Sequence, residues 1–197
     1  DIGSDLSLGG DVERRAVLLC QLGRGPAFDP ERAVLLDPDR PVPADDVAGG
    51  RARLDLHVAR SERELRPLSL LMIDIDYLKR VNDAYGHLLG EFVVGEIGRI
   101  IGAMHEEEGR SATRFGGDEY QGVLPDLSKQ EALRVAEEIR RSVEAHTFER
   151  DDVSATTTIS IGVASYPEDG TTHQELTHAA DAALYRAKRA GGNTVSQ

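Results

Sequence analysis

The feature that most constrains this chain is a glycine pair between two short apolar runs, within residues 113–124. Gly116 and Gly117 predict a tight hairpin turn, because glycine tolerates positive φ and leaves room for a ligand's phosphates. Asp118 and Glu119 follow at the start of the returning strand, and successive strand residues point to opposite faces of a sheet. The two carboxylates are therefore expected to do different jobs. On its own, the pattern fits a metal-assisted phosphate site and a solvated surface hairpin equally well.

The net charge of the chain limits the classes of ligand that it can bind. The 197 residues include 23 Lys and Arg against 35 Asp and Glu, a formal net charge of −12. This balance argues against a nucleic acid partner, because such proteins hold the phosphate backbone with basic side chains. If the chain binds a polyanionic nucleotide, a divalent metal is expected to supply the neutralising charge.

The first part of the chain has a composition of its own. Residues 1–44 hold five of the eight prolines and are expected to be an N-terminal extension or linker without assigned function, ahead of a domain over residues 45–197. The chain begins with Asp1, so we expect a fragment of a longer protein. The single cysteine, Cys20, excludes an intramolecular disulfide and indicates a reducing compartment. No apolar run has transmembrane length, so no membrane segment is expected in this chain.

Hydrophobic periodicity predicts alternating helices and strands. Capping boxes at Ser128 and Thr172 mark the starts of two helices. Further helices are expected at 51–65, 77–85 and 90–105, a buried strand at 68–76, the hairpin at 111–124, a strand at 156–164 and a short last strand at 194–195. This order predicts an α+β sandwich, with a largely antiparallel central sheet flanked by helices.

Two aspartates stand at the end of the buried strand. Asp74 still lies inside the apolar run, whereas Asp76 is expected to cap the following helix. If this strand neighbours the hairpin, Asp74 and Asp118 converge at one edge of the sheet. Carboxylate oxygens in that arrangement suit Mg²⁺ and phosphoryl or nucleotidyl transfer.

Four segments carry a resemblance to a known family. Residues 74–87 resemble the DxDxFKxxND-x-x-GH segment of GGDEF domains, and residues 114–120 look like their signature turn, with Tyr120 in place of Phe. Residues 160–164 are similar to the family's SIGVA strand, and residues 180–188 to its ADxALYxAK helix. The segments occur in the family's order across roughly residues 45–197.

The resemblance implies a palm-like, ferredoxin-like sandwich related to nucleotidyl cyclase catalytic domains. It implies a diguanylate cyclase, which condenses two GTP into cyclic di-GMP and two pyrophosphates with Mg²⁺ or Mn²⁺. Asp118 and Glu119 would then be catalytic, with Glu119 helping to activate the 3′-hydroxyl. The metal ligands would be Asp74, the backbone carbonyl of Ile75, Asp118 and Glu119. Substrate would be held by Leu78, Lys79, Asn82, Glu91, Gly116, Gly117 and Lys188, with Asn82 and Glu91 on guanine and Lys188 on the terminal phosphates.

The implied reaction makes a demand of its own. Two 3′-oxygens must attack two α-phosphorus atoms, so two protomers, each holding one GTP, are expected to face each other in a homodimer. The family further implies an upstream sensor or regulatory domain and a bacterial, cytoplasmic setting.

Some positions depart from the family pattern. Glu91 replaces a guanine-binding Asp, Leu78 replaces Phe, and Gly192 replaces a phosphate-binding Arg. Residues 107–110 lack the RxxD motif, so no inhibitory site of that type is expected. Two alternatives stay open: a degenerate module that binds GTP or a partner without turnover, and a cyclase with altered base choice because of Glu91.

Overall fold

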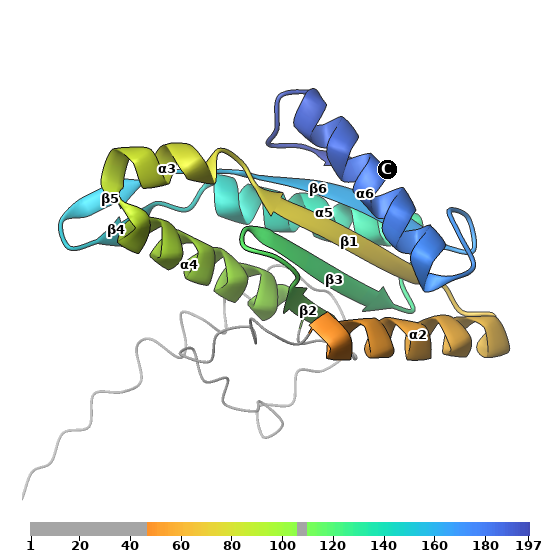
Figure 1. Ribbon diagram of the computed structural model, residues 1–197. Coiled ribbons are helices and arrows are strands. Elements are labelled where there is room, and N and C mark those ends of the chain that lie inside the picture. Colours follow the sequence, from red (N-terminus) through yellow and green to blue (C-terminus); the bar gives the residue numbers. More distant parts are fainter. Residues whose placement is uncertain (1–46, 106–109) are drawn as a thin grey trace, which may run out of the picture. The chain divides into compact units, whose positions relative to one another are not determined.

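The computed structural model describes residues 47–105 and 110–197, and the side chains of 51–103 and 110–197 within them. Its centre is a sheet with the strand order β2-β3-β1-β6-β7. All neighbouring pairs are antiparallel except β6 and β7, which are parallel. The predicted α+β sandwich with a mostly antiparallel sheet is confirmed (Figure 1). The strands are β1 (Leu68–Ile75), β2 (Ser111–Arg114), β3 (Glu119–Pro125), β6 (Ile159–Tyr166) and β7 (Val195–Ser196).

Helices cover both faces of the sheet, because β1 is apolar on both of its faces. Its residues 71, 73 and 75 pack in one core with α4 (His87–His105) and α5 (Lys129–Glu144). Its residues 68, 70 and 72 pack in a second core with α2 (Val47–Glu64) and α6 (His173–Arg189). Successive strand residues alternate between the faces, so Asp74 belongs to the α2/α6 face. The short helix α3 (Leu78–Tyr85) directly follows β1 (Figure 1).

Local signals place the helix ends. The capping boxes at Ser128 and Thr172 are both formed, and they begin α5 and α6 as predicted. Gly86 follows α3, where its amide donates to the Asn82 carbonyl at 2.8 Å. The first helix was expected at 51–65, but α2 ends at Glu64, and Leu65 lies beyond it with φ 54° and is 88% exposed.

A second, two-stranded sheet was not predicted. It pairs β4 (Phe148–Arg150) with β5 (Val153–Ala155) in a hairpin beside the α3–α4 corner (Figure 1). Its turn uses Asp151 and Asp152, both with positive φ. Arg150 fastens this hairpin by donating to the Leu88 carbonyl at 3.1 Å.

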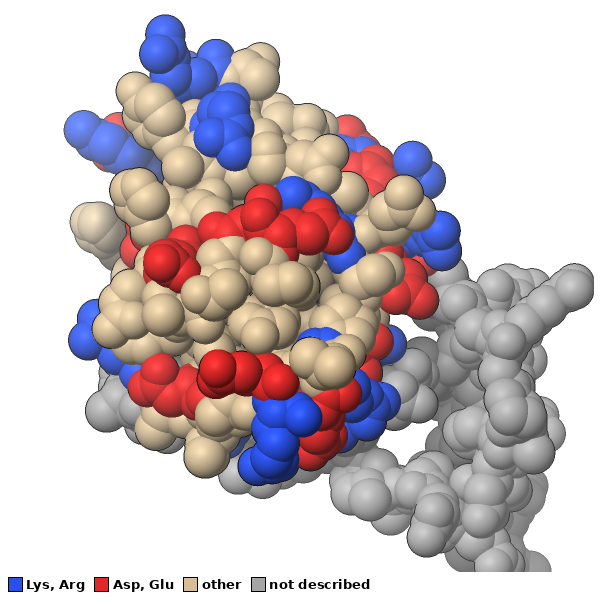
Figure 2. Space-filling model, turned by 90° about the vertical axis from the view of Figure 1, so that its right-hand side faces the viewer, with Lys and Arg blue, Asp and Glu red and all other residues tan. Residues whose placement is uncertain are grey.

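The expectations for residues 1–44, and that for residues 107–110 apart from Arg110, lie outside the described residues. None of the helices at 47–105 and 110–197 is both long and apolar enough to cross a membrane. On the face shown in Figure 2, acidic side chains interrupt the basic ones, so no continuous basic track crosses it.

Candidate active site

The two neighbouring strands β1 and β3 bring the predicted carboxylates to one end of the sheet. In the antiparallel register Asp74 lies directly opposite Glu119. Residues directly opposite each other point to the same face, which here is the face covered by α6. The backbone extends the pairing past Glu119, since the Ile75 amide donates to the Asp118 carbonyl at 3.2 Å. The predicted convergence of the β1 end and the hairpin tip is therefore present in the fold.

The turn between β2 and β3 is fixed by its own backbone and by one arginine. The amides of Phe115 and Gly116 both donate to the Glu119 carbonyl, at 2.8 and 3.2 Å. Arg114 donates from Nε to the Gly116 carbonyl at 3.2 Å and from Nη2 to the Gly117 carbonyl at 2.5 Å. These four bonds hold the turn rigid beneath the carboxylates.

The expected reason for the glycine pair is only half right. Neither Gly116 nor Gly117 has a left-handed φ; among the described glycines that conformation belongs to Gly86, Gly191 and Gly192. What favours glycine at position 116 is room for a side chain, because a Cβ there would lie 2.9 Å from the Glu119 carboxylate, which would have to shift. Gly117 has nothing within 4 Å of such an atom, so its backbone is open to an approaching group.

Lys188 reaches into the site from the last turn of α6. Its ammonium donates to the Asp74 carboxylate, to the Ile75 carbonyl at 3.2 Å and to the Asp76 carboxylate at 2.9 Å. A weaker contact of 3.4 Å joins it to the Asp74 carbonyl. Burial disfavours the charged amine, but the Asp74 and Asp76 carboxylates outweigh it and raise the pKa of Lys188. Lys188 is the cation that neutralises this end of the sheet.

Two carboxylates beside Lys188, those of Asp74 and Glu119, resist ionisation. Burial raises the pKa of Asp74, and the neighbouring Asp118 and Asp76 add to the rise against the opposing effect of Lys188. Burial also raises the pKa of Glu119, with Asp74, Asp118 and Asp181 adding to it. Like charges crowd the site beyond what one ammonium neutralises, and a group that binds here is favoured if it brings positive charge.

The donor set suits a hard divalent cation. Asp74, Asp118 and Glu119 offer carboxylate oxygens and Ile75 a carbonyl oxygen, the ligand type that Mg²⁺ prefers. In the described part of the chain, however, no three acidic, histidine or cysteine side chains are gathered closely enough to hold an ion. Lys188 instead takes the Asp74 carboxylate and the Ile75 carbonyl. The oxygen ligands are of the type that binds a divalent metal, and in the structure the Lys188 ammonium is bonded to two of them.

Asp76 does not cap α3, contrary to the sequence-based expectation. The helix is preceded by Tyr77, which has φ 56° and makes no side-chain capping bond. Asp76 is only 2% exposed and turns toward β6 and the C-terminal turn instead. Its carboxylate accepts from the hydroxyls of Thr158 and Ser160, both at 2.7 Å, and from the Asn193 amide at 2.7 Å.

The residues expected to bind the base lie at the α3–α4 corner. The Asn82 side chain rests on the α4 backbone at Gly90, where a Cβ would come within 1.8 Å of the Asn82 Oδ1. Glu91 follows on α4 with an exposed side chain. On the first turn of α3, Leu78 packs partly against the core and Lys79 is exposed. The predicted base contacts Asn82 and Glu91 thus lie on α3 and α4, whereas the carboxylate group lies at the end of β1 and the start of β3.

Two features of the site escaped the sequence analysis. The ring of donors around Asp76 comes from residues 158, 160, 188 and 193, more than 80 positions along the chain, and it leaves no local signal. The contact of Asn82 with the backbone at Gly90 was the other, and it joins two helices that the sequence pattern does not place against each other.

Comparisons with known proteins agree with one another. The family model described as "Diguanylate cyclase, GGDEF domain" matches residues 51–194. Diguanylate cyclase A of Treponema denticola is 42% identical over 129 residues, which cover 66% of this chain and 34% of that protein. The response regulator PleD of Caulobacter vibrioides is 36% identical over 147 residues, which cover 73% and 32%. The chain thus spans about a third of the length of these bacterial relatives.

Solved structures show the same likeness. The GGDEF domain of TpbB from Pseudomonas aeruginosa matches with a TM-score of 0.73 and 34% identity, covering 76% of this chain and 92% of that one. The GGDEF domain of DgcB from Caulobacter crescentus, solved in complex with c-di-GMP, matches with a TM-score of 0.71 and 29% identity, covering 80% and 96%.

Proposed function

Because the chain belongs to the GGDEF family of diguanylate cyclase domains, we propose that it condenses two GTP into cyclic di-GMP and two pyrophosphates. The observation that carries the proposal is the pairing of Asp74 with Glu119 across β1 and β3, beside Asp118 and under Lys188. Metal-dependent nucleotidyl transfer needs such a group of oxygen donors next to a cation that can meet phosphate.

The chain's own residues would divide the work as follows. Asp74, Asp118, Glu119 and the Ile75 carbonyl would hold Mg²⁺ or Mn²⁺. When bound, such an ion supplies charge stabilisation to the phosphates and lowers the pKa of a coordinated hydroxyl. Lys188 would give up its bond to Asp74 and meet the terminal phosphates as a point charge. The open backbone at Gly117 would let those phosphates come close.

The chemical step balances within one pair of substrates. The 3′-oxygen of one GTP forms a bond to the α-phosphorus of the other, the α–β anhydride bond breaks, and pyrophosphate leaves with that electron pair. The proton of the 3′-hydroxyl goes to a base. Glu119 is assigned this role because its carboxylate lies opposite Asp74 at the same end of the sheet.

A second attack in the opposite sense closes the ring, which requires two sites facing each other in a homodimer. Asn82 and Glu91 would hold guanine through its N1 and N2 hydrogens. We also assign GTP as the substrate and an upstream regulatory domain as the source of control, given that the matched residues cover only about a third of each relative.

A module without turnover is the second candidate. Lys188 already bonds two of the four proposed metal donors, and Gly192 stands where the family pattern has a phosphate-binding Arg. Such a module would bind GTP but release no product. A cyclase of altered base choice is the third candidate, because the longer Glu91 side chain changes the reach to the base.

One incubation separates the three. The protein at high concentration is mixed with Mg²⁺ and GTP, ATP or both, and products are identified by mass spectrometry. We expect cyclic di-GMP from GTP and a loss of at least about a hundredfold in Asp118→Ala, the usual cost of removing a group that acts in the transition state. GTP binding without any dinucleotide would sink the cyclase proposal, and a mixed dinucleotide would support altered base choice.

A further inference from the structure

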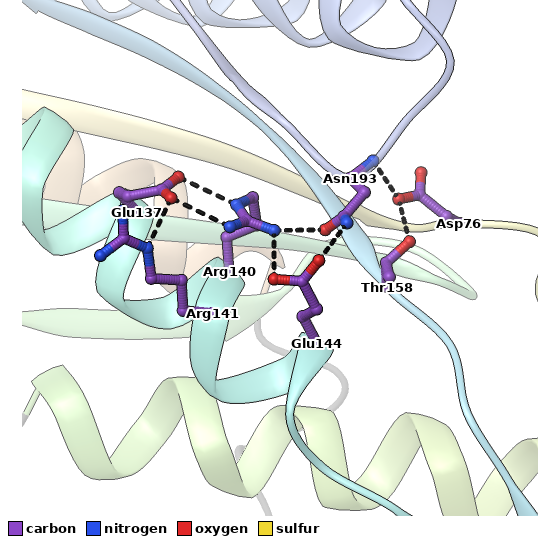
Figure 3. Close-up of polar contacts among 7 residues, drawn as sticks. All are labelled: Asp76, Glu137, Arg140, Arg141, Glu144, Thr158 and Asn193. Atoms are coloured by element: carbon purple, nitrogen blue, oxygen red, sulfur yellow. Dashed lines mark hydrogen bonds and ion pairs between the residues drawn. The ribbon is translucent and has the colours of Figure 1, made fainter.

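A polar network, buried at Asp76 and exposed at Glu144, joins α5 to the candidate active site (Figure 3). At its inner end, the four bonds to the Asp76 carboxylate use both oxygens. Oδ1 accepts from the Ser160 hydroxyl and the Lys188 ammonium, and Oδ2 accepts from the Thr158 hydroxyl and the Asn193 amide. The backbone of Asp76 is fixed as well, because its carbonyl accepts from the Thr157 hydroxyl at 2.6 Å and its amide donates to the Thr158 carbonyl at 2.8 Å. Asp76 is therefore held independently of Lys188.

At the outer end of the network, side chains of α5 form hydrogen bonds with the turn that follows α6. Arg140 donates to the Asn193 Oδ1 at 2.6 Å, and the Asn193 Nδ2 donates to Glu144 at 2.6 Å. Arg140 also bonds Glu144 at 3.0 Å, so the three side chains close a ring (Figure 3). The side chain of Arg140 is 11% exposed and Glu137 holds it with two bonds of 2.9 Å.

The turn after α6, residues 191–193, is tightly packed against Asp76. Gly191, Gly192 and Asn193 all have positive φ. A Cβ on Gly192 would lie 2.9–3.1 Å from three atoms of the fixed Asp76 carboxyl group. The departure from the family's Arg at position 192 thus goes together with a close packing of this turn against Asp76, one turn beyond Lys188.

We propose that Asp76 is a positioning residue for Lys188, and that the Arg140–Glu144–Asn193 ring, which joins α5 to the turn after α6, keeps Asp76 in that role. Asp74 and the Ile75 carbonyl are the groups a metal would take, whereas Asp76 is anchored by Thr158, Ser160 and Asn193. Asp76 can therefore retain Lys188 at the site while the other two contacts are exchanged for substrate phosphates. This inference rests on the proposed function, because it assigns the aim of Lys188 toward those phosphates.

Asp76→Asn tests the inner end. All four bonds to the carboxylate come from donors, and an amide offers an oxygen on one side only. Its NH₂ group would face either the Lys188 ammonium or the Asn193 amide, donor against donor. The change is nearly isosteric, but it removes the bond to either Lys188 or the Asn193 amide.

Arg140→Met tests the outer end, far from any substrate contact. Arg141→Met is the matched control: Arg141 precedes Glu144 on the same helix and bonds Glu137 at 2.8 Å, but its side chain is 70% exposed and makes no bond to Asn193. Thermal unfolding of each variant establishes that it is folded.

The measurement is calorimetric binding of 3′-deoxy-GTP and of GMP to the full chain with Mg²⁺. The first ligand cannot react, and the second lacks the phosphates assigned to Lys188. We expect the preference for the triphosphate to fall about tenfold or more in Asp76→Asn, since a bond to a charged group is lost or misdirected. In Arg140→Met it should fall about threefold, because Asp76 still holds one side of the turn. GMP affinity and Arg141→Met should stay at the parental values.

Two results would overturn the inference alone: an unchanged preference in both folded test variants, or an equal loss of GMP and triphosphate affinity, which is the mark of general structural damage. A parent protein that shows no preference for the triphosphate would overturn the phosphate role of Lys188, and with it both this inference and part of the proposed function.

Discussion

Tyr120 ends the signature turn where the family pattern has Phe, and its hydroxyl gives the residue a second role. The ring is 1% exposed in the core beneath α4. The hydroxyl donates to the Val94 carbonyl at 2.6 Å, which ties the returning strand to the helix. A Cβ at Gly98 would lie 3.3 Å from this ring, so a glycine on α4 makes the room for it. Burial raises the pKa of Tyr120 to about 12.

Tyr120→Phe should therefore change stability in opposite senses at neutral and alkaline pH. At pH 7 it removes one hydrogen bond and should lower the free energy of unfolding by about 1 kcal/mol. Above pH 10 an unfolded tyrosine ionises while the folded one stays neutral, so the parent loses stability as pH rises toward 12, by up to about 2–3 kcal/mol. Phe does not titrate, so the difference should shrink and then reverse.

Urea unfolding of both proteins between pH 7 and pH 11.5 measures that difference. Tyr185→Phe is the control, because Tyr185 is 63% exposed and its ring lies outside the core. A constant difference between the parent and Tyr120→Phe across the pH range would contradict the buried position of the hydroxyl.

Among the elements, α6 matters most to the site because it carries Lys188, and its position is set by a glycine on the strand beneath. Gly162 lies in β6, where a Cβ would come within 2.1 Å of the Ala180 carbonyl oxygen and 2.3 Å of the Leu184 amide nitrogen. Both are helix backbone atoms that cannot move aside alone. The helix α6 therefore lies directly on β6 at this point, which is why the SIGVA segment needs a glycine there.

Gly162→Ala should push α6 away from the sheet. We expect a loss of about 1–3 kcal/mol in the free energy of unfolding, the usual cost of overpacking, and a greater loss of triphosphate binding than of GMP binding. Gly95→Ala is the matched control, because Gly95 lies on the exposed side of α4 and nothing is within 4 Å of its added Cβ. That variant should gain about 0.5–1 kcal/mol. Chemical denaturation of the two variants measures both changes in the free energy of unfolding. An unchanged free energy of unfolding in Gly162→Ala would contradict the close packing.

Elements with a clear period or a cap could be predicted from the sequence. The buried strand, the hairpin and the two capped helices were found because their signals lie within a few residues. The β4–β5 hairpin was missed because strands of three residues are too short to show alternation. Asp76 was misread as a helix cap, since its partners at 158, 160, 188 and 193 are distant in sequence and near only in the fold. Gly116 was placed correctly, but its cause is the room that Glu119 needs.

At the scale of the whole molecule, the proposed reaction needs more than one copy of the candidate site. The carboxylates, Lys188 and the α3–α4 corner proposed to hold the base form one set, whereas the proposed product needs two transfers in opposite senses. The described residues supply one 3′-oxygen acceptor site and one α-phosphate site at best. Activity should therefore belong to a pair of chains, and each member must be complete.

Mixing the parent with Asp118→Ala tests this dependence. At equal amounts and random pairing, about one quarter of the dimers hold two intact sites and about one half hold one. If both sites are needed, cyclic di-GMP formation should fall to about one quarter of the rate of the same total concentration of parent, and the mixed dimers should accumulate the linear dinucleotide. If each chain acted alone, the rate would fall only to about one half. The assay is run well above the concentration at which the parental rate per chain becomes constant, so that dilution of the dimer does not contribute. A parental rate per chain that never depends on concentration, together with a fall to one half, would show that pairing is not required, and the second 3′-attack would then have to occur on a released linear intermediate that rebinds in the same site.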